Sequence, residues 1–397
     1  MKQETFLSPQ ELLQETTAAR RRLTIGIPKE NAATEKRLAL TPEAVDIITE
    51  SGHEVVLESE AGQGIHYSDH DYSESGAQIT GNRAEVFACD FILKIAPPTI
   101  EEIRWMKKRA TILSSLQMPD LSVETIKALS KKQISAIAFE LMTPDGQTFP
   151  VRNAISEIEG AAAISVAAEL LSNEKDGKGI LMGGVPGVSP TEVVITGAGV
   201  AGTVAARAAL ALGATVKIFD SDLRKLRQIQ SDLRYPVFTS VFQPNVLINT
   251  FQSADVVIGA MRYLDDSVRH VISADVIQTM KEGALIIDLR VNQGGCFETT
   301  CFLPKEHPAI FEKHGVKHYC VPNLSSRVAR TAAMSLSNVF TPLIVSMGEL
   351  GGINGIATAD PSFRSGFYMY AGKLVNPYVA KRFNLPANDI GLFLSMF

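Results

Sequence analysis

The residues of this 397-residue chain that could do chemistry begin with a cluster of glycines. Gly197, Gly199 and Gly202 fit the spacing G-x-G-x-x-G, in which the first glycine makes a tight turn and the second lets the backbone approach a pyrophosphate. The third glycine lets the following helix pack closely on a strand, and the N–H groups that begin this helix can bind phosphate oxygens. The cluster therefore predicts a dinucleotide site formed by Gly197, Gly199, Val200, Ala201 and Gly202.

An acidic residue, Asp220, follows about twenty residues later, which is the interval typical of this fingerprint. Its carboxylate would accept hydrogen bonds from the ribose hydroxyls and repel a 2′-phosphate, so it favours NAD over NADP as the cofactor. Arg224 and Lys225, just beyond, could still accommodate a phosphate. The predicted cofactor is NAD, with NADP left open.

The elements needed to position these residues follow from the sequence pattern. A β-rich run over 192–196 precedes the motif, good helix formers occupy 200–212, and a second strand over 215–220 ends at Asp220. Strands and helices alternate on both sides of a Gly- and Pro-rich stretch at 177–190, which indicates two α/β units with parallel sheets. A long helix is expected over 328–349, and we expect the segment 350–397 to pack back on the rest. The other predicted strands cover 23–27, 53–58, 90–95, 110–116, 134–139, 255–260, 284–289 and 316–319, and the other helices cover 41–52, 99–107, 121–132 and 223–233.

Composition excludes several classes of protein. The chain has 38 Lys and Arg against 43 Asp and Glu, so it lacks the basic charge of a nucleic-acid binder. It has no apolar run of membrane length and no signal-peptide core, which predicts a protein without a membrane segment. Cys89, Cys296, Cys301 and Cys320 show neither a CxxC pair nor zinc-ligand spacing. We therefore expect reduced thiols, no metal site and a cytoplasmic location.

Several further motifs follow one another along the chain, namely GIPKE at 26–30, EKRLALTP at 35–42, GILMGGVPG at 179–187, QGGCFE at 293–298, HYCV at 318–321 and Arg330-Thr331. With the glycine fingerprint, these motifs resemble the alanine dehydrogenase and pyridine-nucleotide transhydrogenase α-subunit family, and most of them are similar to alanine dehydrogenase in particular. The resemblance implies two Rossmann-like parallel-sheet domains, with the NAD domain inserted into the substrate domain, and a homo-oligomer, commonly a hexamer. We assign 1–150 to the substrate domain, 151–328 to the NAD domain and 329–397 to a segment returning to the substrate domain.

The resemblance also implies catalytic positions, but three of them carry unexpected residues. Arg37 matches an arginine that holds the substrate carboxylate, a role suited to a planar bidentate donor. Lys94 matches the first of two family lysines, whereas Ala96 occupies the second position. Because residues two apart on a strand share a face, Lys94 could partly substitute. Gln117 stands at the family's catalytic histidine and Asn292 at its aspartate, and neither amide is a general acid or base.

Further positions match cofactor contacts of the family, namely Ser156, Lys225, Ser240 and Met261. Two charged residues depart from or add to the pattern. Glu159 stands where the family prefers a small residue, and Arg290, close to Asn292, could be a second anion anchor.

The resemblance implies NAD-dependent oxidative deamination of L-alanine, or a close small 2-amino acid, to the 2-oxo acid and ammonia by hydride transfer. Two alternatives stay open because the catalytic positions read Ala96, Gln117 and Asn292. One is an NAD(H)-binding relative with different C–N hydride chemistry, such as opine- or saccharopine-like oxidation. The other is a non-catalytic module similar to the transhydrogenase α-subunit.

Overall fold

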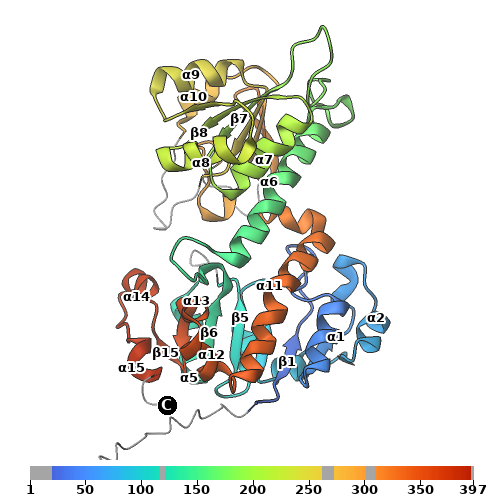
Figure 1. The fold of residues 1–397 in the computed structure, drawn as a ribbon, viewed down its shortest axis with the longest axis vertical. Helices are drawn as coiled ribbons and strands as arrows, with labels where there is room; N and C mark the ends of the chain where they lie inside the picture. The colour runs from blue at the N-terminus through green and yellow to red at the C-terminus, as the bar shows by residue number, and fades with distance from the viewer. Residues whose placement is uncertain (1–19, 117–120, 262–271, 301–308, 395–397) are drawn as a thin grey trace, which may run out of the picture.

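The computed structural model describes residues 20–116, 121–261, 272–300 and 309–394 of the chain. They form two lobes, each built on one sheet, with the helix α6 (Pro150–Leu171) running from one lobe to the other (Figure 1). Each lobe is an α/β unit, so the fold class expected from the sequence is confirmed.

The lower lobe in Figure 1 contains an eight-stranded sheet with the order β15-β14-β6-β5-β4-β1-β2-β3. Strands β1 to β6 are parallel, and β14 and β15 add an antiparallel edge beside β6. The segment after residue 350 therefore does pack back on the first sheet. The strands are β1 (Thr24–Ile27), β2 (Glu54–Glu58), β3 (Gln78–Thr80), β4 (Phe91–Leu93), β5 (Thr111–Ser114), β6 (Ser135–Ala138), β14 (Phe367–Tyr370) and β15 (Lys373–Leu374).

Both faces of this sheet are covered because its central strands are apolar on both sides. In β4, Phe91 and Leu93 pack into one core and Ile92 into another. The first core includes α1 and α11, and the second includes α4 and α5. Such near-continuous apolar runs are typical of strands buried between two helical layers. The helices of this lobe are α1 (Pro42–Glu50), α2 (Asp69–Glu74), α3 (Arg83–Phe87), α4 (Ile100–Trp105), α5 (Val123–Lys131), α11 (Ala329–Glu349), α12 (Ile353–Ala359), α13 (Pro361–Ser365), α14 (Pro377–Phe383) and α15 (Ile390–Leu394).

The upper lobe contains a seven-stranded sheet with the order β12-β13-β11-β10-β7-β8-β9. All its strands are parallel except β12, which pairs with β13 in an antiparallel hairpin. The strands are β7 (Glu192–Thr196), β8 (Thr215–Phe219), β9 (Phe238–Ser240), β10 (Val256–Gly259), β11 (Leu285–Asp288), β12 (Ile310–Lys313) and β13 (Val316–Tyr319). The helices are α7 (Val200–Ala211), α8 (Leu223–Leu233), α9 (Pro244–Ser253) and α10 (Ala274–Gln278).

The strand order reverses once in each sheet, and this locates the expected ligand sites. In the lower sheet the reversal lies between β1 and β4, and in the upper sheet between β7 and β10. In open parallel sheets, ligands bind at the carboxyl ends of the strands at such a reversal. The residues that follow these four strands are therefore the first places to look for a site.

Helix α11 is long and apolar enough, with the short 3₁₀ helix η6 (Leu324–Val328) before it, to cross a membrane by length and composition alone. Its position is that of a core helix. Leu336, Phe340 and Ile344 are fully buried in the core of the lower lobe, and the helix packs against α1 and α6.

Candidate functional site

The glycine fingerprint forms an open turn between β7 and α7 in the upper lobe. Gly197 has φ +113°, and a side chain there would meet the backbone of Ala260 and Met261 across the β7–β10 reversal. A side chain at Gly202 would lie 1.9 Å from the carbonyl oxygen of Gly197. A side chain at Gly199 would instead meet nothing within 4 Å. Two glycines therefore close the turn, and the third leaves the open space that a pyrophosphate needs beside the start of α7.

Asp220 follows β8 and holds this turn in place. One carboxylate oxygen accepts a hydrogen bond from the N–H of Ala198 at 2.8 Å, and the other accepts one from the N–H of Asp222, also at 2.8 Å. The Asp220 side chain is buried, yet each oxygen has a second lone pair with which it can accept a ribose hydroxyl. The sequence prediction did not include this bond to Ala198.

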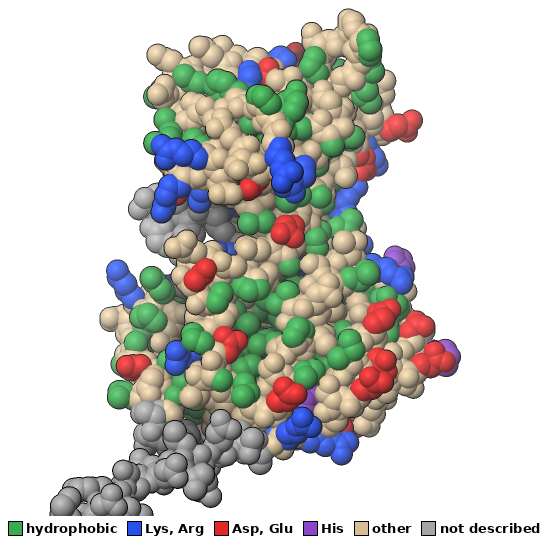
Figure 2. All heavy atoms as spheres, viewed as in Figure 1, with side chains coloured by type: hydrophobic (Ala, Val, Ile, Leu, Met, Phe, Trp, Pro, Cys, Tyr) green, Lys and Arg blue, Asp and Glu red, His purple; other side chains and the backbone are tan. Residues whose placement is uncertain are grey.

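Ser240 and Lys225 lie on the two elements beside Asp220. The carbonyl of Ser240, at the end of β9, accepts a hydrogen bond from the N–H of Asp220, so the two residues are neighbours at the same sheet edge. Lys225 is exposed in the first turn of α8, next to Arg224, which pairs with Asp222 at 3.0 Å. Figure 2 shows Lys and Arg side chains on the lower part of the upper lobe, where α8 lies in Figure 1. Positive charge at this edge is compatible with an anionic cofactor.

The loop after β11 is fixed by a carboxylate that the sequence prediction did not include. Asp288 accepts hydrogen bonds from the N–H groups of Arg290 and Cys296, both at 2.8 Å, and from the hydroxyl of Thr300. Burial raises the pKa of Asp288, because a charged carboxylate is costly away from water. The loop is also tied to the β10 side, since the Cys296 thiol donates to the carbonyl of Met261.

This loop contains Asn292, within the 3₁₀ helix η5 (Val291–Gln293). The side chain of Asn292 lies outside the described part of the structure, and so does the whole of Gln117. Their predicted roles stay predictions.

On the side of the lower lobe, Arg37 is held by a buried network. Its Nε and Nη2 donate to the two oxygens of Glu35 at 2.8 and 2.6 Å, and its Nη1 donates to Ser325 Oγ at 2.9 Å. Burial opposes the charged guanidinium, but the bonds and charge of Glu35, with the charges of Glu159 and Glu30, keep the Arg37 pKa above its usual value. Arg37 therefore stays charged.

The geometry of the guanidinium decides whether Arg37 can still bind a substrate. Glu35 accepts the side-on pair of hydrogen bonds of the guanidinium, which Nε and Nη2 donate. A guanidinium has five N–H donors, and one on each Nη forms a second, end-on pair. Those two donors point away from Glu35, and Nη1 has a second hydrogen besides the one that it gives to Ser325. Arg37 can therefore bind a carboxylate end-on while Glu35 stays bound.

Lys94 follows β4 at the reversal of the lower sheet, but its charge is already paired. Its Nζ lies 2.7 Å from Glu30 and 3.7 Å from Glu102, and the side chain is 5% exposed. Glu30 also accepts hydrogen bonds from the N–H groups of Ile95 and Ala96. Burial raises the pKa of Glu30. In this arrangement Lys94 pairs with Glu30 and Glu102 and stabilises the turn after β4. Its predicted role toward the substrate stays a prediction.

Helix α6 connects the two groups of residues. A side chain at Gly160 would lie 2.3 Å from the carbonyl oxygen of Ala201, so α6 touches the first turn of α7 directly. Ser156 lies one helical turn earlier, on the same face of α6. Glu159 accepts a hydrogen bond of 3.4 Å from Ser325 Oγ, and Ser325 in turn accepts the bond from Arg37. The glycine turn therefore contacts Gly160 of α6, and Arg37 is linked through Ser325 to the adjacent residue, Glu159.

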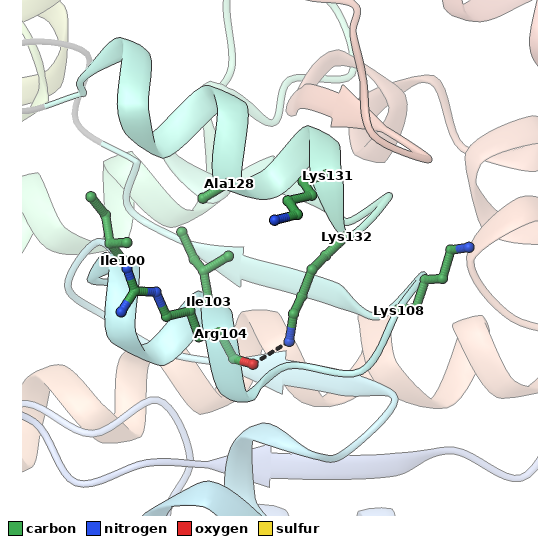
Figure 3. Close-up of a pocket in the computed structure, with 7 residues that line it drawn as sticks. All are labelled: Ile100, Ile103, Arg104, Lys108, Ala128, Lys131 and Lys132. Carbon is green, nitrogen blue, oxygen red and sulfur yellow. Dashed lines mark hydrogen bonds between the residues drawn. The ribbon is translucent and has the colours of Figure 1, made fainter.

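A separate cavity of about 490 Å³ lies between α4 and α5 (Figure 3). It shares no residue with the glycine turn or with the network around Arg37. Lys132 on its wall donates to the carbonyls of Arg104 and Met106, as expected for a lysine that caps the end of α4. It is lined by Ile100, Ile103, Arg104, Lys108, Ala128, Lys131 and Lys132.

Comparison with known proteins agrees with this geometry. A family model described as alanine dehydrogenase/PNT, N-terminal domain, matches residues 26–159, and the corresponding C-terminal domain model matches residues 163–377. Alanine dehydrogenase of Staphylococcus saprophyticus is 34% identical over 366 residues, which cover 92% of this chain and 98% of that protein. Alanine dehydrogenase 2 of Staphylococcus aureus has the same identity and coverage.

Solved structures show the same relationship. A structure of L-alanine dehydrogenase has a TM-score of 0.84 and 32% identity, and the match covers 91% of this chain and 99% of that one. The transhydrogenase from Sinorhizobium meliloti has a TM-score of 0.74 at 23% identity, over 89% of this chain and 99% of that one, which supports the fold alone. The chain therefore belongs to the alanine dehydrogenase/PNT family.

Proposed function

We propose that the chain catalyses the NAD-dependent oxidative deamination of L-alanine, or of a close small 2-amino acid, to the 2-oxo acid and ammonia. The observation that carries the proposal is the meeting, on helix α6, of the turn at Gly199 with the network that contains Arg37. Hydride transfer requires a substrate anchor and a dinucleotide site side by side. The relatives named alanine dehydrogenase support the same reaction.

Residues of both lobes contribute to the proposed site. Arg37 binds the substrate carboxylate with its end-on N–H pair, while Glu35 keeps the guanidinium in orientation. The glycine turn binds the pyrophosphate through the backbone of α7, and Asp220 accepts the ribose hydroxyls. When bound, NAD supplies the acceptor for the hydride that leaves the α-carbon.

The test is the formation of NADH from NAD and L-alanine, followed by absorbance at pH 9–10, where loss of protons favours this direction. The expected result is steady turnover that depends on both substrates. A panel of bulkier and doubly anionic 2-amino acids distinguishes a different C–N chemistry. Binding of NADH without turnover of any amino acid would refute the proposal and favour a non-catalytic module.

We also propose NAD rather than NADP as the cofactor, a homo-oligomer with the hexamer as its expected form, and a cytoplasmic location. Asp220 supports the choice of NAD, and the family resemblance supports the oligomer. Among the described cysteines, Cys89, Cys296 and Cys320 are free and buried, which suits a reducing compartment. Burial raises the pKa of Cys89 to about 11, so its thiol stays protonated. The domain boundaries at 150 and 328 belong to this proposal as well.

A further inference from the structure

The proposed reaction needs a group that takes a proton from the substrate. An amino acid binds as an ammonium, and its nitrogen must lose a proton before its lone pair can form a C=N bond. The three family positions that carry such chemistry read Ala96, Gln117 and Asn292 here, and none of these side chains is a base. The structure provides a different candidate on helix α6.

Three carboxylates act on the charge of Arg37, namely Glu35, Glu159 and Glu30. Glu35 uses both its oxygens on Arg37, and Glu30 accepts bonds from Lys94 and two backbone N–H groups. Both are buried, with side chains 4% exposed. Glu159 is only half-buried, so it is the most exposed of the three.

The position of Glu159 relates it to both substrates at once. Through Ser325 it lies two hydrogen bonds from the guanidinium of Arg37, at 3.4 and 2.9 Å. The next residue, Gly160, packs on Ala201 in the first turn of α7. Glu159 therefore lies between the anchor for the substrate carboxylate and the turn that would hold the dinucleotide.

We infer that Glu159 binds the α-ammonium group of the substrate and acts as the general base of the reaction. Arg37 and Glu159 present a cation and an anion joined through one serine, which complements the carboxylate and ammonium of a 2-amino acid. The inference rests on the proposed function, and it gives the proton-transfer role to a residue that stands where the family prefers a small side chain.

The step balances as follows. One N–H bond of the ammonium breaks and an O–H bond forms on Glu159. The freed lone pair forms the C=N bond as the α C–H pair leaves as hydride for the oxidised dinucleotide. Water then adds to the carbon of this iminium, and its two protons pass to the nitrogen. The C–N bond breaks, the 2-oxo acid keeps the oxygen of the water, and the nitrogen leaves as ammonium. Glu159 returns its proton to solvent.

The test compares Glu159→Gln and Glu159→Asp with a matched control, Glu157→Gln. Glu157 is exposed on the same helix, two residues away and so on the opposite face. Loss of a general base costs roughly 10²- to 10⁴-fold in rate, so we expect kcat of Glu159→Gln to fall by at least 100-fold. We also expect it to lose the rise of activity with pH that reports the base. Glu159→Asp should recover part of kcat and the shape of the pH profile, and Glu157→Gln should match the wild type.

Binding provides a readout that does not depend on turnover. L-alanine carries the ammonium group and pyruvate does not, so calorimetry of Glu159→Gln should show at least a tenfold loss of affinity for L-alanine and less than a twofold change for pyruvate. Thermal unfolding checks that the variant is folded. An active wild type with Glu159→Gln unchanged in kcat and pH profile would overturn the inference. A wild type that turns over no amino acid would overturn the proposed function instead. In that case calorimetry still tests the ammonium contact, because an equal loss of affinity for L-alanine and pyruvate in Glu159→Gln would reject it.

Discussion

Replacing Gly199 by alanine separates cofactor binding from folding. Gly199 is the N-cap of α7 with φ −81° and ψ −170°, ordinary extended backbone that alanine also adopts. The new methyl group would meet nothing within 4 Å. Alanine lowers the conformational entropy of the unfolded chain, which stabilises the folded protein by about 0.4–1 kcal/mol. Alanine is also a poorer N-cap than glycine, which destabilises α7. These two small effects oppose each other. We expect the free energy of unfolding to change by less than about 1 kcal/mol.

The effect on the cofactor should be much larger. The methyl group of Gly199→Ala occupies the space in which a pyrophosphate would approach the backbone N–H groups. Losing one hydrogen bond to a charged group costs roughly 1.5–3 kcal/mol, which corresponds to about a 10- to 150-fold rise in Kd. NADH fluorescence titration measures this change, and urea unfolding of the same samples measures stability.

Gly202→Ala is the matched contrast on the same turn. Its methyl group would lie 1.9 Å from the carbonyl oxygen of Gly197, a backbone atom that cannot move aside without displacing the turn. We expect this variant to lose roughly 1–3 kcal/mol of stability or more, together with NADH binding. If Gly199→Ala bound NADH as tightly as the wild type, the turn would not be the pyrophosphate site. If Gly202→Ala were fully stable, the packing argument would be wrong.

Three further predictions concern buried titratable groups. The His318 ring is fully buried against Thr299, and burial lowers its pKa to about 4, below the value near 6.5 of the unfolded chain. The neutral ring therefore contributes its full stability above pH 6.5, and roughly 3 kcal/mol of the free energy of unfolding is lost as the pH falls towards 4. In urea unfolding, the stability of His318→Gln should depend less on pH over this range than that of the wild type. Asp288→Asn keeps one acceptor oxygen but cannot accept all three bonds, so hydrogen exchange of residues 289–300 should speed up; unchanged protection would contradict this assignment. Lys94→Met leaves Glu30 buried without its partner, so the free energy of unfolding measured in urea should fall by roughly 3–5 kcal/mol. Adding Glu30→Gln to this variant should restore part of the loss. If the effects of the two substitutions simply add, the pair is not coupled.

Local patterns predicted the elements around the glycine motif well. Strand β7, helix α8 and strand β13 begin and end at the residues expected from the sequence, because short apolar runs and turn residues define them. Helix α6 was not predicted. It is covered by α7, α11 and η6, so its small apolar residues surround the helix and do not form a periodic stripe.

The candidate site divides in the same way. The fingerprint and Asp220 are close in sequence, and a local pattern was sufficient to find them. The contacts of Arg37 with Ser325, and of Ser325 with Glu159, join distant parts of the chain, and no spacing rule predicts them. The sequence did signal that Glu159 was unusual for the family. Only the structure relates it to Arg37.

The edge of the lower sheet has a consequence for the order of events during synthesis. Strand β6 pairs with β14, with Ile137 opposite Phe367, so one edge of β6 is completed only by residues near the end of the chain. At 5–20 residues per second, β6 waits roughly 10–50 s on the ribosome for its neighbour. The strands of the upper sheet lie between residues 192 and 319, so that lobe can complete its sheet first. During the delay the nascent chain exposes one unpaired edge of an apolar strand, because the other edge of β6 pairs with β5. We expect this edge to favour chaperone binding, and aggregation when translation stalls.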